Sequence, residues 1–190
     1  SAHYISGEFI GGDHLERIVI LRVDRNDSQP RALMDYPVKA AMLPYGTVYY
    51  HGQPASLRDI PIGTHLHGWF YERADSDAKQ WQMVRGKLQN VSGERMSPEV
   101  DFTRCLRLED DYSYHARRER IWKVDRFELS ENKRFATLQL DGKPQGKAQE
   151  FDLRSSTVVY QGDGFGTLKS IEPGQHVQMN LTWATLYGPG

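Results

Sequence analysis

The sequence predicts a mainly β protein in which two small β-barrels follow one another in tandem, joined by a short helical segment. Two observations carry this prediction: one phrase occurs twice, and short β-rich runs alternate with turn residues roughly every 8 to 12 positions. We expect the first barrel in residues 1–95, a linker with a short helix in 96–120 and the second barrel in 121–190. A chain of 190 residues is long enough for two small domains.

The phrase that occurs twice begins at Thr47 and again at Thr157. Thr-Val-Tyr-Tyr-His-Gly is followed by Leu-Arg-Asp-Ile-Pro-Ile-Gly-Thr-His, and Thr-Val-Val-Tyr-Gln-Gly by Leu-Lys-Ser-Ile-Glu-Pro-Gly-Gln-His. The matching residues lie 110 positions apart in the first part and 111 in the second, so one residue has been inserted in the loop. Matches at one offset over two strands and a turn indicate that a segment was duplicated.

The first half begins with a predicted hairpin and continues through the repeated phrase. Runs rich in β-forming residues, separated by turn residues, predict strands. Apolar content favours a further strand at residues 33–42, where Pro37 indicates a sheet edge or a bulge. The predicted strands are Ile5 to Ile10, Arg17 to Val23 after a Gly11-Gly12-Asp13 turn, Thr47 to Tyr50, His65 to Tyr71, and Trp81 to Leu88 after a polar hairpin tip from Glu72 to Lys79.

The best helical candidate of the chain lies between the halves, from Asp101 to Glu119. Asp101 can cap a helix, and Phe102, Cys105 and Leu106 have helical spacing. The residues after Glu109 favour a break, so we expect one short helix or two helical turns. A polar stretch, Gln89 to Pro98, precedes this segment and is the predicted linker.

The second half repeats the order of the first: hairpin, strand, strand, short apolar turn, strand. This pattern resembles the oligonucleotide- and oligosaccharide-binding (OB) fold. The Thr-x-Val-Tyr-x-Gly and Leu-x-x-Ile-x-x-Gly phrases also resemble small bacterial exported β-barrel domains of unknown function. The resemblance covers only the repeated phrase in each half. It implies a barrel fold and a periplasmic or extracellular location, and it carries no catalytic residues.

Composition and charge restrict the functional classes. The chain has 24 Lys and Arg against 25 Asp and Glu, so no long-range field draws it to nucleic acid or to an anionic membrane. No apolar run approaches the length of a membrane span. The single cysteine, Cys105, cannot form an internal disulfide, and its apolar position favours packing over nucleophilic chemistry. The first residue is Ser1 and not Met, which fits either a shortened chain or removal of an export signal.

Alternation along the strand that begins at His65 predicts the candidate site. Leu66 and Phe70 are expected to face the core, and His65, His67 and Trp69 are expected to form an exposed stripe on the other face. Two imidazoles on one face can ligate Zn²⁺ or Cu²⁺. Such a site needs further ligands, and the sequence offers His51 across the turn but no Cys or acidic motif at a fixed spacing. Solvated strand histidines are therefore the interpretation that the sequence favours, and metal binding is the alternative.

A second candidate surface surrounds Trp122, in the groove expected between the barrels. The basic run Arg117 to Lys123 includes this ring, and nucleic-acid binding requires a basic groove with aromatic platforms. The run Glu109-Asp110-Asp111 lies just upstream and opposes that field. A solvated helix face or a bridge between the barrels is therefore the expected role of the basic run.

Enzyme signatures are missing from the sequence: it contains no Gly-x-x-x-x-Gly-Lys, no His-Glu-x-x-His and no Gly-x-Ser-x-Gly. We therefore expect a non-catalytic binding or interaction module without a cofactor. Its expected partner is an unidentified protein or small ligand and not nucleic acid. The alternatives are a Zn²⁺ or Cu²⁺ protein that uses His65 and His67, and a single-stranded nucleic-acid binder. The candidate ligand-binding residues are His51, His65, His67, Trp69 and Trp122.

Overall fold

The computed structural model describes the chain except residues 30, 73–101, 132–133, 142–145, 183–185 and 187–190. The predicted strand Trp81 to Leu88, the polar stretch Gln89 to Pro98 and the hairpin tip beyond Glu72 lie outside the described residues. None of the helices in the described part is long and apolar enough to cross a membrane.

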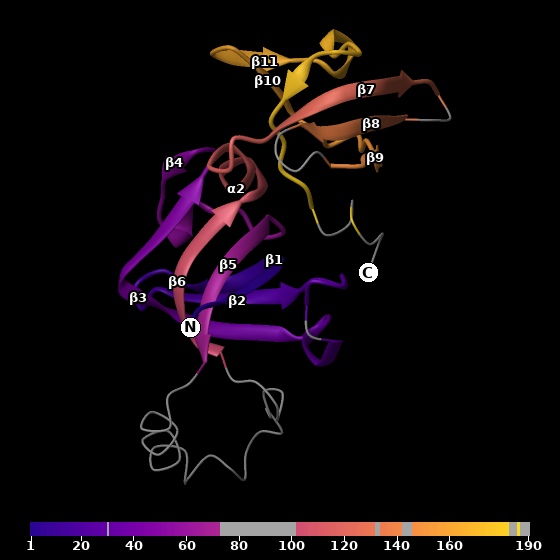
Figure 1. Cartoon of the computed structure of the whole chain (residues 1–190). Helices are drawn as coiled ribbons and strands as arrows, with labels where there is room; N and C mark the ends of the chain where they lie inside the picture. The colour runs from indigo at the N-terminus through magenta and orange to yellow at the C-terminus, as the bar shows by residue number, and fades with distance from the viewer. Residues whose placement is uncertain (30, 73–101, 132–133, 142–145, 183–185, 187–190) are drawn as a thin grey trace, which may run out of the picture.

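The first half folds as a closed β-barrel of five strands (Figure 1). The strands follow the order β2-β1-β5-β6-β3, and a further pairing of β2 with β3 closes the ring. All neighbours are antiparallel except β3 and β6, which run parallel. This topology is compatible with an OB-like small barrel. The strands are β1 (His3–Asp13), β2 (Ile18–Val23), β3 (Pro37–Tyr50), β5 (His65–Glu72) and β6 (Phe102–Asp110).

Alternate side chains of these strands fill the barrel. Leu66 and Phe70 of β5 are fully buried, as the sequence predicted, and they pack with Leu21 of β2, Ile5 of β1 and Leu108 of β6. Three short elements connect the barrel strands. They are the 3₁₀ turns η1 (Arg31–Leu33) and η2 (Leu57–Asp59) and the strand β4 (Gln53–Pro54), which pairs with the end of β3.

The hairpin between β1 and β2 turns at residues 14–17, later than the predicted Gly11-Gly12-Asp13 turn. Gly11 follows a β-bulge, at which the register with β2 shifts between Phe9 and Gly11. A Cβ on Gly12 would lie 2.1 Å from the carbonyl oxygen of Ile18. The two glycines therefore serve a bulge and a close approach of strands, not the turn itself.

The helix predicted from Asp101 to Glu119 is wrong for Phe102–Asp110, which form β6 between β3 and β5. The register with β5 shifts so that Arg107 pairs with Trp69 and Cys105 pairs with Phe70, which leaves Leu106 as a bulge. The bulge lets Cys105 and Leu108 both enter the core although they are three residues apart. A spacing of three between buried residues, which is typical of a helix, is thus produced here by a bulged strand. β6 lies within residues 96–120 and completes the barrel.

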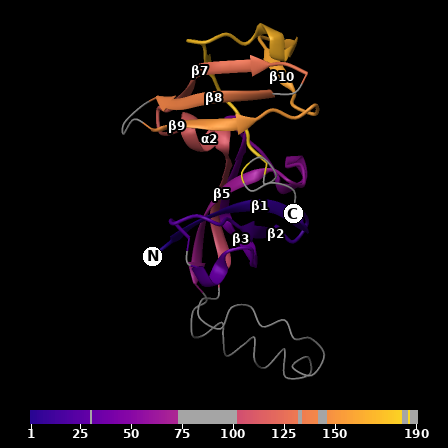
Figure 2. The ribbon, with the colours of Figure 1, turned by 90° about the vertical axis from the view of Figure 1, so that its right-hand side faces the viewer.

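The predicted short helix is present as α2 (Asp111–Ala116), directly after β6. Asp110 caps it, because its Oδ1 accepts a hydrogen bond of 2.9 Å from the backbone N–H of Ser113. In Figures 1 and 2, α2 lies between the barrel and the sheet formed by the second half.

Burial raises the pKa of the Cys105 thiol to about 12, so the group is protonated at neutral pH and has no solvent access. We expect the native protein not to react with a thiol reagent within minutes, whereas the guanidinium-unfolded chain reacts at once. Ser156→Cys, which adds a thiol at an exposed position, should react in the native state and is the control. If Cys105 of the native protein were labelled as fast as the thiol added by this control, the buried position of β6 would be contradicted.

The second half forms an open sheet of four strands in the order β12-β7-β8-β9, with a separate hairpin of β10 and β11. This order corresponds to β5-β1-β2-β3 of the barrel, and no described residue of this half takes the place of β6. A second closed barrel is therefore not observed among the described residues. The strands are β7 (Ile121–Leu129), β8 (Arg134–Asp141), β9 (Ala148–Asp152), β10 (Val159–Gln161), β11 (Gly164–Gly166) and β12 (His176–Val177).

The repeated phrase adopts the same local structure in both halves. η2 has its counterpart in η3 (Leu168–Ser170), and each ends at an isoleucine with φ of -90°. Gly63 and Gly174, three positions further on, have φ of 93° and 88°, a region that favours glycine. The correspondence supports the duplication, which stays a prediction.

Candidate functional site

The strand stripe predicted to be exposed is covered. His65 and His67 are only 5% and 6% exposed, and Trp69 is half-buried. The alternation along β5 was predicted correctly, but α2 lies over the second face of the strand: the ring of Tyr114 stacks on that of His67 at 3.7 Å. The interpretation of surface histidines is therefore wrong, because strand periodicity separates two faces without showing whether the outer one is covered.

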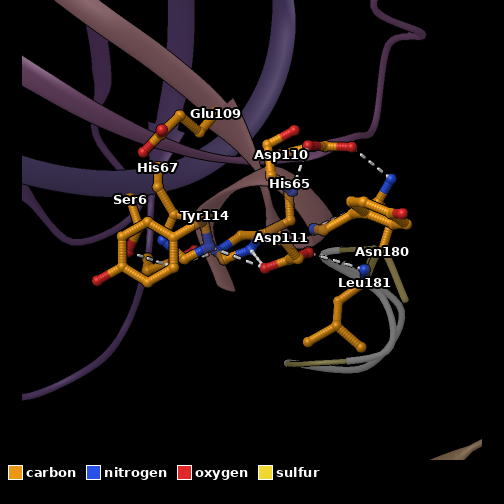
Figure 3. Close-up of polar contacts among 12 residues, drawn as sticks. Ser6, His65, His67, Glu109, Asp110, Asp111, Tyr114, Asn180 and Leu181 are labelled. Carbon is orange, nitrogen blue, oxygen red and sulfur yellow. Dashed lines mark hydrogen bonds and ion pairs between the residues drawn. The ribbon is translucent and has the colours of Figure 1, made fainter. Parts of the chain in front are cut away.

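The buried histidines share one carboxylate, that of Asp111 at the start of α2 (Figure 3). Nδ1 of His65 and Nε2 of His67 lie 2.7 and 2.9 Å from the same Asp111 oxygen, Oδ1. The other nitrogen of His65 is 2.7 Å from Oδ2 of Asp24, which directly follows β2. The other nitrogen of His67 is 2.7 Å from the hydroxyl of Tyr4 on β1.

These contacts determine the protonation of the two rings. Burial by itself would lower the pKa of His65, but Asp111 and Asp24 outweigh it and raise this pKa to about 10. His65 is thus an imidazolium that donates from both nitrogens. Burial lowers the pKa of His67, so this ring is neutral, donates from Nε2 to Asp111 and accepts from Tyr4. Burial opposes ionisation of Asp111, yet the two histidines hold its pKa well below the usual range.

Further contacts tie this cluster to its surroundings. Oδ2 of Asp111 accepts the backbone N–H of Leu181 at 2.8 Å, so the second half of the chain reaches the cluster. Ser6 donates its hydroxyl to Oδ2 of Asp24 at 2.7 Å. Oδ1 of Asp24 is buried and has no hydrogen-bond partner among the described residues. Within the group of Asp24, His65, His67 and Asp111, two carboxylates face one imidazolium, so the negative charges exceed the positive ones by one, which is costly in a buried place.

The acidic run Glu109-Asp110-Asp111, predicted to oppose the basic run in solution, is fully buried. Asp110 accepts the backbone N–H of His51 at 2.8 Å and the side-chain amide of Asn180 at 2.8 Å. Glu109 accepts two hydrogen bonds from Arg117, at 2.5 and 2.8 Å. The run therefore lies at the junction of the barrel, α2 and the C-terminal segment.

Two predicted site residues lie elsewhere. The ring of His51 is exposed and stacks on Tyr50 at 4.1 Å, and it does not belong to the group of possible metal ligands found in the described chain. Trp122 is 4% exposed and belongs to the core of the second sheet, edge-on to Phe151 at 5.5 Å. Trp122 therefore offers no platform for a base, which removes the aromatic part of the predicted nucleic-acid surface.

The fold and the site define a mainly β protein with a closed five-stranded barrel and a buried His-Asp cluster beside it. Comparisons with models of protein families, with curated proteins and with solved structures find no match. The chemistry of the cluster is therefore the basis on which a function is argued.

Proposed function

We propose that this protein is a non-catalytic binding module that holds a divalent transition metal, Zn²⁺ in the first place, through His65, His67 and Asp111. One observation carries the proposal: each of the three buried residues offers a ligand atom, and these atoms all lie within 4.8 Å of one another. Two imidazoles and a carboxylate are a donor set that zinc uses, with a fourth position left for water or another ligand.

Two of the three proposed ligand atoms are imidazole nitrogens. Nitrogen ligands favour a transition metal over Mg²⁺ or Ca²⁺, which prefer oxygen. The second nitrogen of His65 is held by the Asp24 carboxylate. Metal-bound histidines commonly have such a carboxylate, which orients the ring and increases its basicity. Both the Asp24 contact of His65 and the types of the ligand atoms therefore support the proposed transition-metal site.

The charge of the cluster favours a cation. When a divalent ion replaces the proton on Nδ1 of His65, the proton of His67 moves from Nε2 to Nδ1, beside the Tyr4 hydroxyl. Two carboxylates then balance the two positive charges of the metal, and the cluster has no excess negative charge. Metal binding would lengthen the two nitrogen–oxygen distances at Asp111 by about half an ångström. A tetrahedral zinc site with bonds of 2.0–2.1 Å separates its ligand atoms by about 3.3 Å, and the two nitrogens lie 2.7 and 2.9 Å from the Asp111 oxygen.

The metal would have a structural role at the junction of the two halves. His65 and His67 belong to β5, Asp111 begins α2, and the same carboxylate accepts a hydrogen bond from Leu181. A metal on Asp111 therefore fixes α2 against the barrel and holds the oxygen to which the C-terminal segment is bonded.

Calorimetry on the chelator-treated protein tests the proposal. Titration with Zn²⁺ or Cu²⁺ should show one site, and titration with Mg²⁺ should show none. Removing an outer partner of a metal-bound histidine already costs about 10- to 100-fold in affinity, so replacing a ligand in His65→Gln or His67→Gln should cost more than about 100-fold. The matched control is His176→Gln, because this histidine takes the place of His65 in the second copy and is exposed. No heat with either metal would remove the metal function.

A further inference from the structure

A second candidate site lies beside β3, β5, β6 and the residues that follow α2. A pocket of about 350 Å³ opens there, and none of the three proposed metal ligands lines it. Ligand pockets range from about 300 to 1,000 Å³, so this one has room for a small molecule and not for a polymer. The lining comes from β3, β5, β6 and the residues after α2: Tyr45, Thr47, Trp69, Leu106, Arg107, Arg117 and Arg118.

The pocket carries an excess of positive charge. Three arginines line it, and the acidic partner that they share is Glu109, whose side chain is 1% exposed. Glu109 lies 2.5 Å from Nε of Arg117, and 3.7 and 3.8 Å from Nη1 of Arg107 and of Arg118. One carboxylate compensates one of three guanidinium groups, so two positive charges remain at the pocket among the residues that the structure describes.

The arginines are held in place before any ligand arrives. Nε of Arg107 donates to the hydroxyl of Thr47 at 3.3 Å, and the guanidinium of Arg118 lies 3.5 Å above the ring of Tyr114. Nη1 of Arg118 also donates to the carbonyl of Tyr114 at 2.9 Å. A guanidinium has five N–H donors in a fixed plane, and these contacts use only part of them. Such groups bind phosphate or carboxylate with little loss of side-chain entropy.

Two aromatic side chains line the pocket together with the three arginines. Trp69 is half-buried in the wall, and Tyr45 is 72% exposed at the rim. Aromatic rings and arginine planes are the surfaces on which nucleobases and similar flat groups stack. An exposed tyrosine beside uncompensated arginines is a place for a ligand that has both a ring and a negative charge.

We propose that this pocket binds a small anion that joins a phosphate or carboxylate to a flat ring, with the acid on Arg107, Arg117 and Arg118 and the ring between Trp69 and Tyr45. This inference does not depend on the proposed metal function. The chelator-treated protein should bind the anion as well as the zinc-loaded protein does, so the two proposals can fail separately.

Binding of adenosine monophosphate, followed by tryptophan fluorescence and calorimetry on the full chain, tests the proposal. AMP should bind at one site, and inorganic phosphate and adenosine should each bind at least about tenfold more weakly, because each lacks one half of the recognition. Equal affinity for phosphate and AMP would overturn the proposal, since the ring would then contribute nothing. Tighter binding of a single-stranded oligonucleotide than of AMP would overturn the assignment to a small ligand.

Two variants locate the site. Arg118→Gln should weaken AMP binding at least about tenfold and reduce its dependence on salt. Tyr45→Ala changes a side chain that is mostly exposed, so the fold is retained, and it should weaken AMP binding several-fold while leaving phosphate binding unchanged. Arg126→Gln, an exposed arginine of β7 that pairs with Glu128, is the matched control and should have no effect. Unchanged AMP affinity in both Arg118→Gln and Tyr45→Ala would exclude this pocket.

Discussion

Replacing Asp111 by alanine is expected to cost the metal-free protein about 3–5 kcal/mol in the free energy of unfolding, because it breaks a buried ion pair and leaves its partners behind. His65 would keep only one of its two carboxylates, His67 would lose the acceptor of its N–H, and the backbone N–H of Leu181 would lose its partner. Urea unfolding in the presence of a chelator, followed by circular dichroism, measures this cost.

The chain offers a matched control in its second half. Asp141 and His176 also form an aspartate-histidine pair, 3.6 Å apart, but both side chains are about half exposed. Asp141→Ala should therefore cost no more than about 1 kcal/mol. Asp111→Asn, which keeps the shape and removes the charge, should fall between the two alanine variants. Equal costs for Asp111→Ala and Asp141→Ala would contradict the buried network.

The pH dependence of the same proteins gives an independent measurement. The folded protein raises the pKa of His65 from 6.5 to about 10, so the stability that this group contributes is fully present below pH 6.5 and is lost as the pH rises toward 10. Asp111 has a lowered pKa, so its contribution is present above its ordinary value of 3.8 and is lost as the pH falls further. The metal-free wild type should lose stability between pH 6.5 and 10, and Asp111→Ala should lose less over the same range.

Much of the barrel could be predicted from local sequence. Alternation and turn residues located β1, β2, β5 and the end of β3, and they assigned Leu66 and Phe70 to the core. β6 was missed because Phe102, Cys105 and Leu106 have the spacing of a helix face, whereas Leu106 is the bulge between two residues that pair with β5. The pairing that reveals β6 as a strand comes from β3 and β5, which are distant in sequence.

The site could be predicted only in part, for a similar reason. His65 and His67 share a strand face, so their spacing alone brought them together. Asp111 and Asp24 meet His65 across 46 and 41 residues of chain, and no local spacing records such contacts. The sequence signal that could have indicated Asp111 is the acidic run Glu109-Asp110-Asp111, which follows a β-rich stretch. Acidic residues at the start of a helix often cap it or bind a partner.

Leu108→Ala is expected to destabilise the protein by about 2–5 kcal/mol, the range for a large-to-small change in a packed core. Leu108 is fully buried in β6, opposite Val48 of β3 and Gly68 of β5, and a Cβ on Gly68 would lie 3.2 Å from its Cδ2. The Phe70 ring and the Leu108 side chain together occupy the space beside Gly68, because a Cβ there would also lie 2.1 Å from Cε2 of Phe70. Alanine at position 108 would leave a cavity in this packed place.

Leu15→Ala makes the same chemical change at a residue that is 80% exposed in the turn between β1 and β2, and it should shift the unfolding free energy by less than about 0.5 kcal/mol. Urea unfolding of the two variants side by side separates burial from the change of side chain itself. If β6 were part of a linker and not the strand that closes the barrel, Leu108 would have no core to fill, and both variants would be equally mild. A large difference between them therefore tests barrel closure directly, at the barrel strand that the sequence analysis missed.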